Sequence, residues 1–334
     1  MNHYIPVDNS LTRGEMQAAR GRICLGLCCI NETLKPKGIK VNRGCIRRTF
    51  TVERALELAK QNVSDLIPIL QYNVDHNIGS YRLSSDMFPH FTDDETESYT
   101  PTPEIVEILQ KTGEFCKMHN QRLSMHPGQY TVLATPDLQT FEKAVTDLEH
   151  HAWILDTLQA DDRATLCVHV GGGYGDMEAT VRRWIERFDE LPRAVKNRLA
   201  IENTERNGSV RECLTIAQEC KIPIIYDAHH EVCYRYLHQN TEKIESIEDQ
   251  MDEIVESWGG RSPLFHASDQ DTSNPRVGTH SKFLNELPAT QVRCCQEYDV
   301  DITIELECKA KEKAIEDIQE KYSFLFTKSE HTIV

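Results

Sequence analysis

Short runs of apolar residues recur along the chain, and between them lie longer segments whose apolar residues fall at helical spacing. Each run is bounded by polar or turn-forming residues, which is typical of strands buried on both faces. The runs predict eight strands, at residues 23–27, 80–83, 122–125, 165–168, 199–201, 224–226, 263–265 and 301–304. The intervening segments predict helices at residues 51–76, from 103 onward, at 138–158, 177–188, 210–220 and 242–258, and from 309 onward.

This alternation of strand and helix predicts the fold class. Strands joined through helices form a parallel sheet, and eight such units are typical of a closed (β/α)8 TIM barrel. No glycine- or serine-rich linker divides the pattern. We therefore expect an α/β chain with one barrel domain over residues 22–326, a leader at 1–21 and a short tail at 327–334.

The composition narrows the cellular setting. The first nine residues are polar and unlike a signal peptide, and no apolar run approaches the length of a membrane span. We therefore expect an intracellular protein, in the cytoplasm or nucleoid or, in a eukaryote, in the nucleus. The twelve cysteines are scattered through apolar segments, so we interpret them as reduced core thiols. For Cys28, which directly follows the first predicted strand, a functional role is the alternative.

The net charge of −16 argues against a protein that coats nucleic acid by bulk attraction. A local basic groove remains compatible with it. Arg43, Arg47 and Arg48 follow the first strand as a compact basic patch that would suit a phosphate backbone. Ordinary surface charge is the alternative interpretation.

Metal-ligating residues follow the apolar runs repeatedly. At residues 224–230 the sequence IIYDAHH passes from a strand directly into a carboxylate and two imidazoles, and buried charge of this kind needs a partner. A divalent ion can use all of these groups, whereas a hydrogen-bonded His–Asp pair would use fewer of them. The same pattern places ligand-type residues after six of the predicted strands: His126, His169, Glu202, Asp227, His230, His266, and Glu305 or Glu307.

In a TIM barrel the carboxyl ends of all strands meet at one mouth, where the active site lies. Seven ligand-type residues there exceed the needs of one ion, so the sequence predicts a multinuclear metal site. Gln129 and Tyr130 follow a candidate ligand and could contact a base or a sugar. The glycines at 171–173 and 175 lack the spacing of a phosphate-binding loop, and we interpret them as room for backbone beside the metals and for a substrate phosphate.

Several of these stretches resemble, in order and spacing, the UV damage endonuclease family. The resemblance extends from residue 25 to Lys313 and is most specific in the first two of the following motifs. They are SMHPGQY (124–130), VHVGGGYG (168–175), IEN (201–203), YDAHH (226–230), HAS (266–268) and ECKAKEKA (307–314). The His/Glu/Asp pattern alone is shared with endonuclease IV and the xylose-isomerase-like barrels.

The resemblance implies a repair nuclease that recognises UV photoproducts in double-stranded DNA and nicks the strand on the 5′ side of the lesion. We expect a monomer. It implies up to three divalent ions, manganese above all, with zinc or magnesium as alternatives. The implied metal ligands are His126, His169, Glu202, Asp227, His230, His266, His280 and Glu307. We expect Glu202, His169 and Asp227 to be the catalytic residues, and Glu202 to bridge two ions because it lies on a central strand.

The resemblance also implies contacts to DNA. We expect them from Gln129, Tyr130, Leu27, Asn31, Arg47 and His229. Gln129 falls where the family probes the lesion, and His229 is expected beside the cluster because His230 has the ligand's spacing from Asp227.

Two positions depart from the family pattern. Leu27 stands where the family often has a second probing residue, a tyrosine, although leucine can also wedge between bases. Leu264 stands where the family often has a carboxylated lysine that bridges metals, and leucine can bind nothing. Three alternatives remain open: an abasic-site endonuclease like endonuclease IV, a metal-dependent sugar isomerase or epimerase, and a catalytically inactive DNA-binding protein.

Overall fold

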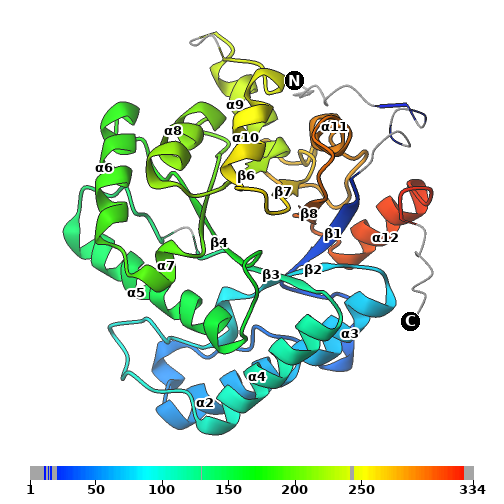
Figure 1. The fold of residues 1–334 in the computed structure, drawn as a ribbon. Helices are drawn as coiled ribbons and strands as arrows, with labels where there is room; N and C mark the ends of the chain where they lie inside the picture. Colours follow the sequence, from blue (N-terminus) through cyan, green and yellow to red (C-terminus); the bar gives the residue numbers. More distant parts are fainter. Residues whose placement is uncertain are drawn as a thin grey trace.

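The computed structural model describes residues 11, 12, 14, 16, 21–128, 130–240 and 244–326, and confirms the predicted barrel. Its eight strands are parallel and close in chain order, β1 pairing with both β2 and β8 (Figure 1). The strands are β1 (Ile23–Cys28), β2 (Ser80–Leu83), β3 (Arg122–Met125), β4 (Thr165–His169), β5 (Leu199–Glu202), β6 (Ile224–Asp227), β7 (Leu264–Ala267) and β8 (Ile302–Leu306). The expected leader and tail fall almost wholly outside the described residues.

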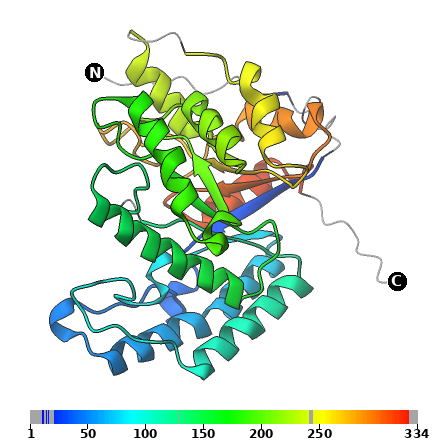
Figure 2. The same ribbon diagram turned by 60° about the vertical axis from the view of Figure 1, so that its left-hand side comes forward.

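Helices surround the strands on the outside of the barrel (Figures 1 and 2). They are α2 (Val52–Ser64), α3 (Leu66–Asp75), α4 (Pro103–Met118), α5 (Leu138–Thr157), α6 (Met177–Glu190), α7 (Arg193–Lys196), α8 (Val210–Cys220), α9 (Ala228–His238), α10 (Met251–Ser257), α11 (Ala289–Glu297) and α12 (Glu312–Lys321). Short 3-10 turns are η1 (Lys35–Lys37), η2 (Arg47–Thr49), η3 (Ser85–Met87) and η4 (Glu248–Gln250). Within the described part of the chain, no helix has both the length and the apolarity needed to cross a membrane.

The single helix predicted at residues 51–76 is wrong, because the structure divides it into α2 and α3 at Asp65. Pro68 explains the division. A proline has no backbone N–H, and in a continuous helix its ring would clash with the carbonyl of Ser64, four residues earlier. Placed in the first turn of α3, Pro68 costs no helical hydrogen bond.

Other differences arise where the sequence lacks a clear helical pattern. The helices α9 and α11 were not predicted, since α9 begins among the candidate ligands and α11 is rich in polar and cysteine residues. The helix predicted at residues 242–258 is shorter, because regular structure begins only at η4 and continues as α10. Residues 241–243 lie outside the described part.

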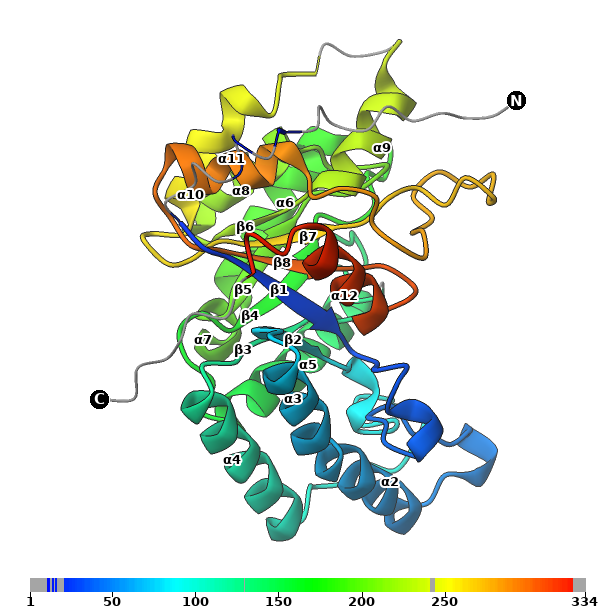
Figure 3. The ribbon, with the colours of Figure 1, turned by 90° about the vertical axis from the view of Figure 1, so that its right-hand side faces the viewer.

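The loops that follow the strands gather at one end of the barrel. In Figure 3 the loop between β7 and α11 and the loop after β1 both extend beyond the end toward which the β1 arrow points. This end is the mouth of the barrel, and the last residues of β4, β5 and β6 are His169, Glu202 and Asp227.

The barrel interior divides into a polar half and an apolar half. Around β8, β2 and β3, Glu305 accepts hydrogen bonds from Ser80 Oγ (3.0 Å) and Ser124 Oγ (2.6 Å). Gly26 of β1 leaves space for this carboxylate, since a Cβ there would lie 2.6 Å from Glu305 Cγ. Across the interior, a separate buried apolar cluster contains Cys167, Ala200, Ile225, Trp258 and Leu264.

Candidate metal centre

Glu202 is the centre of the site and has no exposed surface. As the last residue of β5 it lies opposite His169 in the sheet register. Its Oε2 atom lies 3.0 Å from His126 Nε2 and 3.1 Å from His169 Nε2. Its Oε1 atom lies 2.8 Å from His266 Nδ1. One carboxylate thus faces imidazoles from three other strands or strand ends.

Asp227 and His230 complete one side of this centre. Asp227 is the N-cap of α9, and its Oδ1 accepts a hydrogen bond from the backbone N–H of His230 at 2.7 Å. Its Oδ2 is buried without a hydrogen-bond partner among the described residues. His230 Nδ1 lies 3.6 Å from Glu202 Oε1 and 3.8 Å from Asp227 Oδ2. The N-cap geometry explains why His230, rather than its neighbour, faces the carboxylates.

Glu305 and Glu307 both point into the barrel, one layer apart. The sequence left these two as alternative ligands, but strand parity does not separate them, because residues two apart in a strand share a face. Glu307 is the residue at the mouth: His266 Nδ1 lies 3.6 Å from Oε1, and His280 Nε2 lies 3.4 Å from Oε2. Arg82 also forms an ion pair with Glu307. Glu305 lies deeper, with its two serine donors.

Burial and charge act in opposite directions on these groups. Burial alone would raise the pKa of Glu202, but His266 and His169 hold it well below its usual value. Burial alone would lower the pKa of His266, yet Glu202 and Glu307 raise it well above its usual value. The neighbouring histidines therefore favour the anionic form of Glu202, and Glu202 in turn favours positive charge on its neighbours.

Hydrogen bonds to backbone carbonyls orient two of the imidazoles. His126 Nδ1 lies 3.1 Å from the carbonyl oxygen of Pro127, and His230 Nδ1 lies 2.9 Å from that of Asn203. A carbonyl only accepts, so each Nδ1 carries the hydrogen and each neutral ring keeps its lone pair on Nε2. For His126 that lone pair then faces the Glu202 carboxylate at 3.0 Å, and a cation bound by both groups would remove the repulsion between them.

The donor set fits divalent ions. Five groups of three residues have ligand atoms that all lie within 4.8 Å of one another. They are His126–His169–Glu202, Cys167–Glu202–His266, His230–His280–Glu307, Glu202–Asp227–His230 and Asp227–His266–Glu307. These groups include every metal ligand predicted from the sequence and connect through shared residues, with Glu202 in three of them.

Cys167 was interpreted from the sequence as a core thiol. The structure instead places its Sγ 2.9 Å from Glu202 Oε2, directly beneath the site. Cys167 is two residues before His169 on β4, so the strand period puts both side chains on the inner face. That spacing was visible in the sequence and was not used. Leu264, at the position of the family lysine, is fully buried in the apolar half of the interior.

The residues expected to contact DNA differ in how accessible they are. Tyr130 is 83% exposed and available, whereas Gln129 lies outside the described residues. Leu27 is fully buried in the main core, so the expectation that it wedges between bases is wrong. The strand period points its neighbour Gly26 into the barrel and Leu27 toward the helices.

Two further expectations of DNA contact are corrected by burial. Asn31 is 2% exposed, and its Oδ1 caps the backbone N–H of Leu34 at 2.8 Å. His229 is 3% exposed, and its ring centroid lies 5.3 Å from that of His280, so it lies beside the cluster as expected but does not reach the surface.

The basic patch is largely neutralised. Arg47 pairs with Asp93 at 2.7 Å and also contacts Glu95, while Arg43 pairs with Asp65 at 2.6 Å. Arg47 keeps a half-exposed side chain that could still reach a phosphate. For Arg43 the alternative of structural surface charge fits better, since it also donates to the carbonyl of Gly38 at 2.6 Å.

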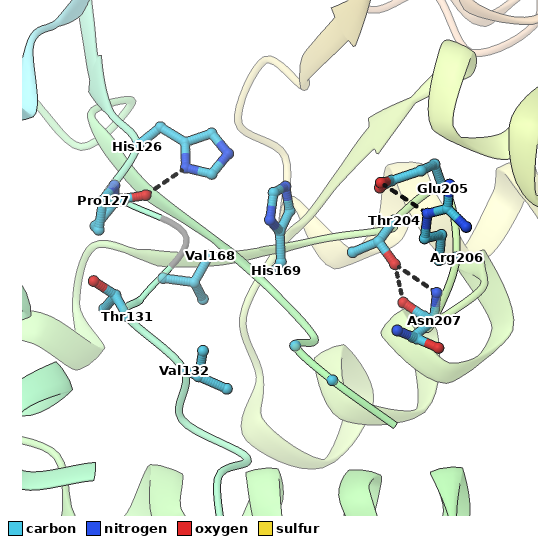
Figure 4. Close-up of a pocket in the computed structure, with 13 residues that line it drawn as sticks. His126, Pro127, Thr131, Val132, Val168, His169, Thr204, Glu205, Arg206 and Asn207 are labelled. Carbon is cyan, nitrogen blue, oxygen red and sulfur yellow. Dashed lines mark hydrogen bonds and ion pairs between the residues drawn. The ribbon is translucent and has the colours of Figure 1, made fainter. Parts of the chain in front are cut away.

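A pocket opens beside His126 and His169 (Figure 4). One wall comes from the segment after β3, and the glycines at 171 and 172 also line the pocket. The other wall is the loop after β5, residues 204–207, which the sequence interpretation did not identify. Arg206 in this loop is half exposed and forms a long ion pair with Glu205, at 3.8 Å. The position of this loop directly after the IEN motif was the signal in the sequence.

The chain is similar to UV endonucleases over most of its length. The family model UV-endonuclease UvdE matches residues 23–326. The UV DNA damage endonuclease of Clostridium perfringens (strain 13 / Type A) is 33% identical over 245 residues, which are 72% of this chain and 58% of that protein. The chain thus matches less than two thirds of that relative's length. The UV DNA damage endonuclease of Bacillus anthracis (strain A0248) is 30% identical over 271 residues, 79% of this chain and 81% of that protein.

A solved structure is also similar to this chain. The crystal structure of SacUVDE has a TM-score of 0.79 and 28% identity to this chain, and the match covers 91% of this chain and 99% of that one. The similarity therefore spans the barrel and the strand ends that carry the candidate ligands.

Proposed function

The chain belongs to the UV-endonuclease UvdE family, and from this membership we propose that it uses divalent ions to hydrolyse the phosphodiester on the 5′ side of UV photoproducts in double-stranded DNA. The observation that carries the proposal is the Glu202 carboxylate, fully buried and within 3.1 Å of three imidazoles. Such a centre has little use in a structural protein, because burying these groups without an ion is costly.

The proposed cluster holds up to three ions, manganese above all. Its ligands are His126, His169, Glu202, Asp227, His230, His266, His280 and Glu307. When bound, such ions neutralise a phosphodiester and lower the pKa of a water molecule. Glu202 is the proposed bridge, because its two oxygens face different imidazoles.

The protein's own contribution is to hold these groups in place before DNA arrives. The carbonyls of Pro127 and Asn203 fix the rings of His126 and His230. Arg82 holds Glu307 by an ion pair, and Asp227 is fixed as the cap of α9. A preorganised set of charges of this kind stabilises a reacting phosphate without reorganising during the reaction.

For lesion recognition we propose the rim of the pocket in Figure 4. Tyr130 offers an exposed aromatic ring for base stacking, and Gln129 remains the proposed probe of the lesion. Arg206 and Arg47 are the cations proposed to contact phosphates. A photoproduct distorts the duplex, and poorly stacked bases cost less to extrude, which would favour damaged sites.

The test is a nicking assay on three duplexes of one sequence, UV-irradiated, untreated and containing an abasic site, each incubated with the protein and Mn²⁺. We expect cleavage of the irradiated strand at the phosphodiester 5′ to the photoproduct. Preferential cleavage at the abasic site would instead support an activity like that of endonuclease IV.

The site assignment is tested with His169→Ala and Glu202→Gln. We expect each to reduce nicking at least about 100-fold, because loss even of a partner of a metal ligand typically costs 10- to 100-fold. His119→Ala is the matched control, since this histidine precedes β3 at the opposite end of the barrel. Parent-like nicking by either site variant would contradict the assignment of this mouth.

A further inference from the structure

Cys167 is a buried thiol aimed at the centre of the site. It lies on the inner face of β4, and its side chain is 1% exposed. Its Sγ lies 2.9 Å from Glu202 Oε2, the oxygen that also faces His126 and His169. A thiol is only a weak hydrogen-bond donor, and most buried cysteines pack as small apolar side chains. Here it contacts the most central carboxylate of the molecule.

Among the residues that the structure describes, the apolar cluster around Cys167 offers no other ligand atom. The interior cluster around it consists of Ala200, Ile225, Trp258 and Leu264. Leu264 is fully buried and carries no donor atom, so an ion bound beneath Glu202 can receive a ligand from this half of the interior through Cys167.

A second buried ligand residue belongs to the same group, since His266 Nδ1 lies 2.8 Å from the other oxygen of Glu202, Oε1. His266 is fully buried, and its Nε2 has no hydrogen-bond partner in the described ranges, although Glu305 Oε2 lies 3.5 Å away. Ligand atoms of Cys167, Glu202 and His266 all lie within 4.8 Å of one another. Three donor atoms at this separation can surround one ion.

We propose that Cys167 is a thiolate ligand of the cluster, binding one ion together with Glu202 and His266. On binding, the S–H bond breaks, the sulfur donates its electron pair to the ion, and the proton passes to solvent. Thiolate favours zinc and cobalt, whereas manganese and magnesium favour oxygen ligands. This site is therefore selective for zinc-type ions. The inference rests on the proposed metal dependence but not on the DNA substrate.

The first test uses Co²⁺ as a spectroscopic probe of the metal-free protein. A cobalt–thiolate bond gives a charge-transfer absorption band in the near ultraviolet, which oxygen and nitrogen ligands do not give. We expect the band in the parent and its loss in Cys167→Ser, which keeps a hydroxyl near Glu202 but removes the sulfur. Cys294→Ala is the matched control, because it removes an equally buried thiol of α11. Retention of the band in Cys167→Ser would overturn the proposal.

The second test needs no variant and so does not depend on how well a variant folds. X-ray absorption of the zinc-loaded parent should contain zinc–sulfur scattering at about 2.3 Å. A spectrum fitted by nitrogen and oxygen neighbours alone would overturn the proposal.

A competition experiment measures selectivity. Parent and Cys167→Ser are dialysed against equal concentrations of Zn²⁺ and Mn²⁺, and the ratio of bound zinc to bound manganese is measured. We expect this ratio to be at least about tenfold lower in the variant, because losing even a residue that only supports a metal ligand typically costs 10- to 100-fold in affinity. An unchanged ratio would contradict the proposal. Nicking of irradiated DNA is scored separately, so a protein that binds zinc through sulfur but leaves DNA intact would refute the proposed function and preserve this inference.

Discussion

The two oxygens of Glu202 divide the site between them. Oε2 faces His126, His169 and the Cys167 thiol, and Oε1 faces His266 with His230 farther away. Each carboxylate oxygen thus faces its own set of possible metal ligands, and the carboxylate links the two sets. At this scale the chemistry depends on single atoms: a residue one position away on a strand points to the opposite face, as Leu27 illustrates.

Glu307 and Glu305 provide a test at the level of one residue. We expect Glu307→Gln to weaken Mn²⁺ binding at least about tenfold, because Glu307 belongs to two of the ligand groups. Glu305→Gln should weaken it less, since Ser80 and Ser124 occupy one oxygen of Glu305 and no ligand group includes it. Calorimetric titration of both variants checks this, and a larger effect for Glu305→Gln would assign the ligand to the deeper layer.

Among the elements, strands were easier to predict than helices. The eight strands were located to within two residues at each end, because both faces of each strand are largely buried and most of the strands are mainly apolar. The helices α9 and α11 were missed because ligands and polar residues occupy positions that normally carry the helical pattern. In the same way, the predicted ligands followed from residue type at strand ends, whereas the contact of Cys167 required knowing which strand faces are inward.

The helix α5 carries a buried histidine that should make stability depend on pH. His150 stacks on Phe91 with ring centroids 3.9 Å apart, and neither ring nitrogen has a hydrogen-bond partner within the described residues. Burial lowers its pKa to about 3. The unfolded chain, with a pKa near 6.5, therefore binds the proton first, and stability falls as the pH decreases from about 6.5 toward 3.

We expect His150→Phe to remove this contribution while keeping the stacked ring. Between pH 6 and 4 the free energy of unfolding of the parent should fall more steeply than that of the variant, by up to about 1.4 kcal/mol per pH unit. Urea unfolding of both proteins at several pH values measures the difference. His76→Phe serves as control, since His76 is about 40% exposed. Parallel pH profiles for parent and His150→Phe would show that the ring titrates normally in the folded protein.

At the scale of the whole molecule, negative charge is concentrated inside as well as outside. The chain carries a net charge of −16. The barrel interior contains Glu202, Asp227 and Glu307 at the mouth and Glu305 one layer deeper. Among the described residues, Arg82 forms ion pairs with two of them. Bound cations would offset the remaining repulsion and so contribute to folding as well as to chemistry.

We therefore expect chelation to lower the midpoint of thermal unfolding and added Mn²⁺ or Zn²⁺ to restore it. An ion present at about a thousand times its Kd stabilises the folded state by about 4 kcal/mol per site. Glu202→Gln should show a much smaller difference between chelated and metal-loaded protein. Calorimetric scans with and without metal provide the measurement, and equal shifts in parent and variant would place the stabilising ions elsewhere.

The pairing of β1 with β8 has a consequence for the biogenesis of this protein. Synthesis starts from the N-terminus at about 5–20 residues per second, so β1 leaves the ribosome roughly 15 to 55 seconds before its last partner. During that interval the nascent sheet has two open edges, which are sites of aggregation. His280 and Glu307 also emerge late, so the proposed ion cluster could be completed only once translation has reached them. Metal loading would then be among the last steps of maturation, and the unclosed sheet stays open to aggregation until β8 has been made.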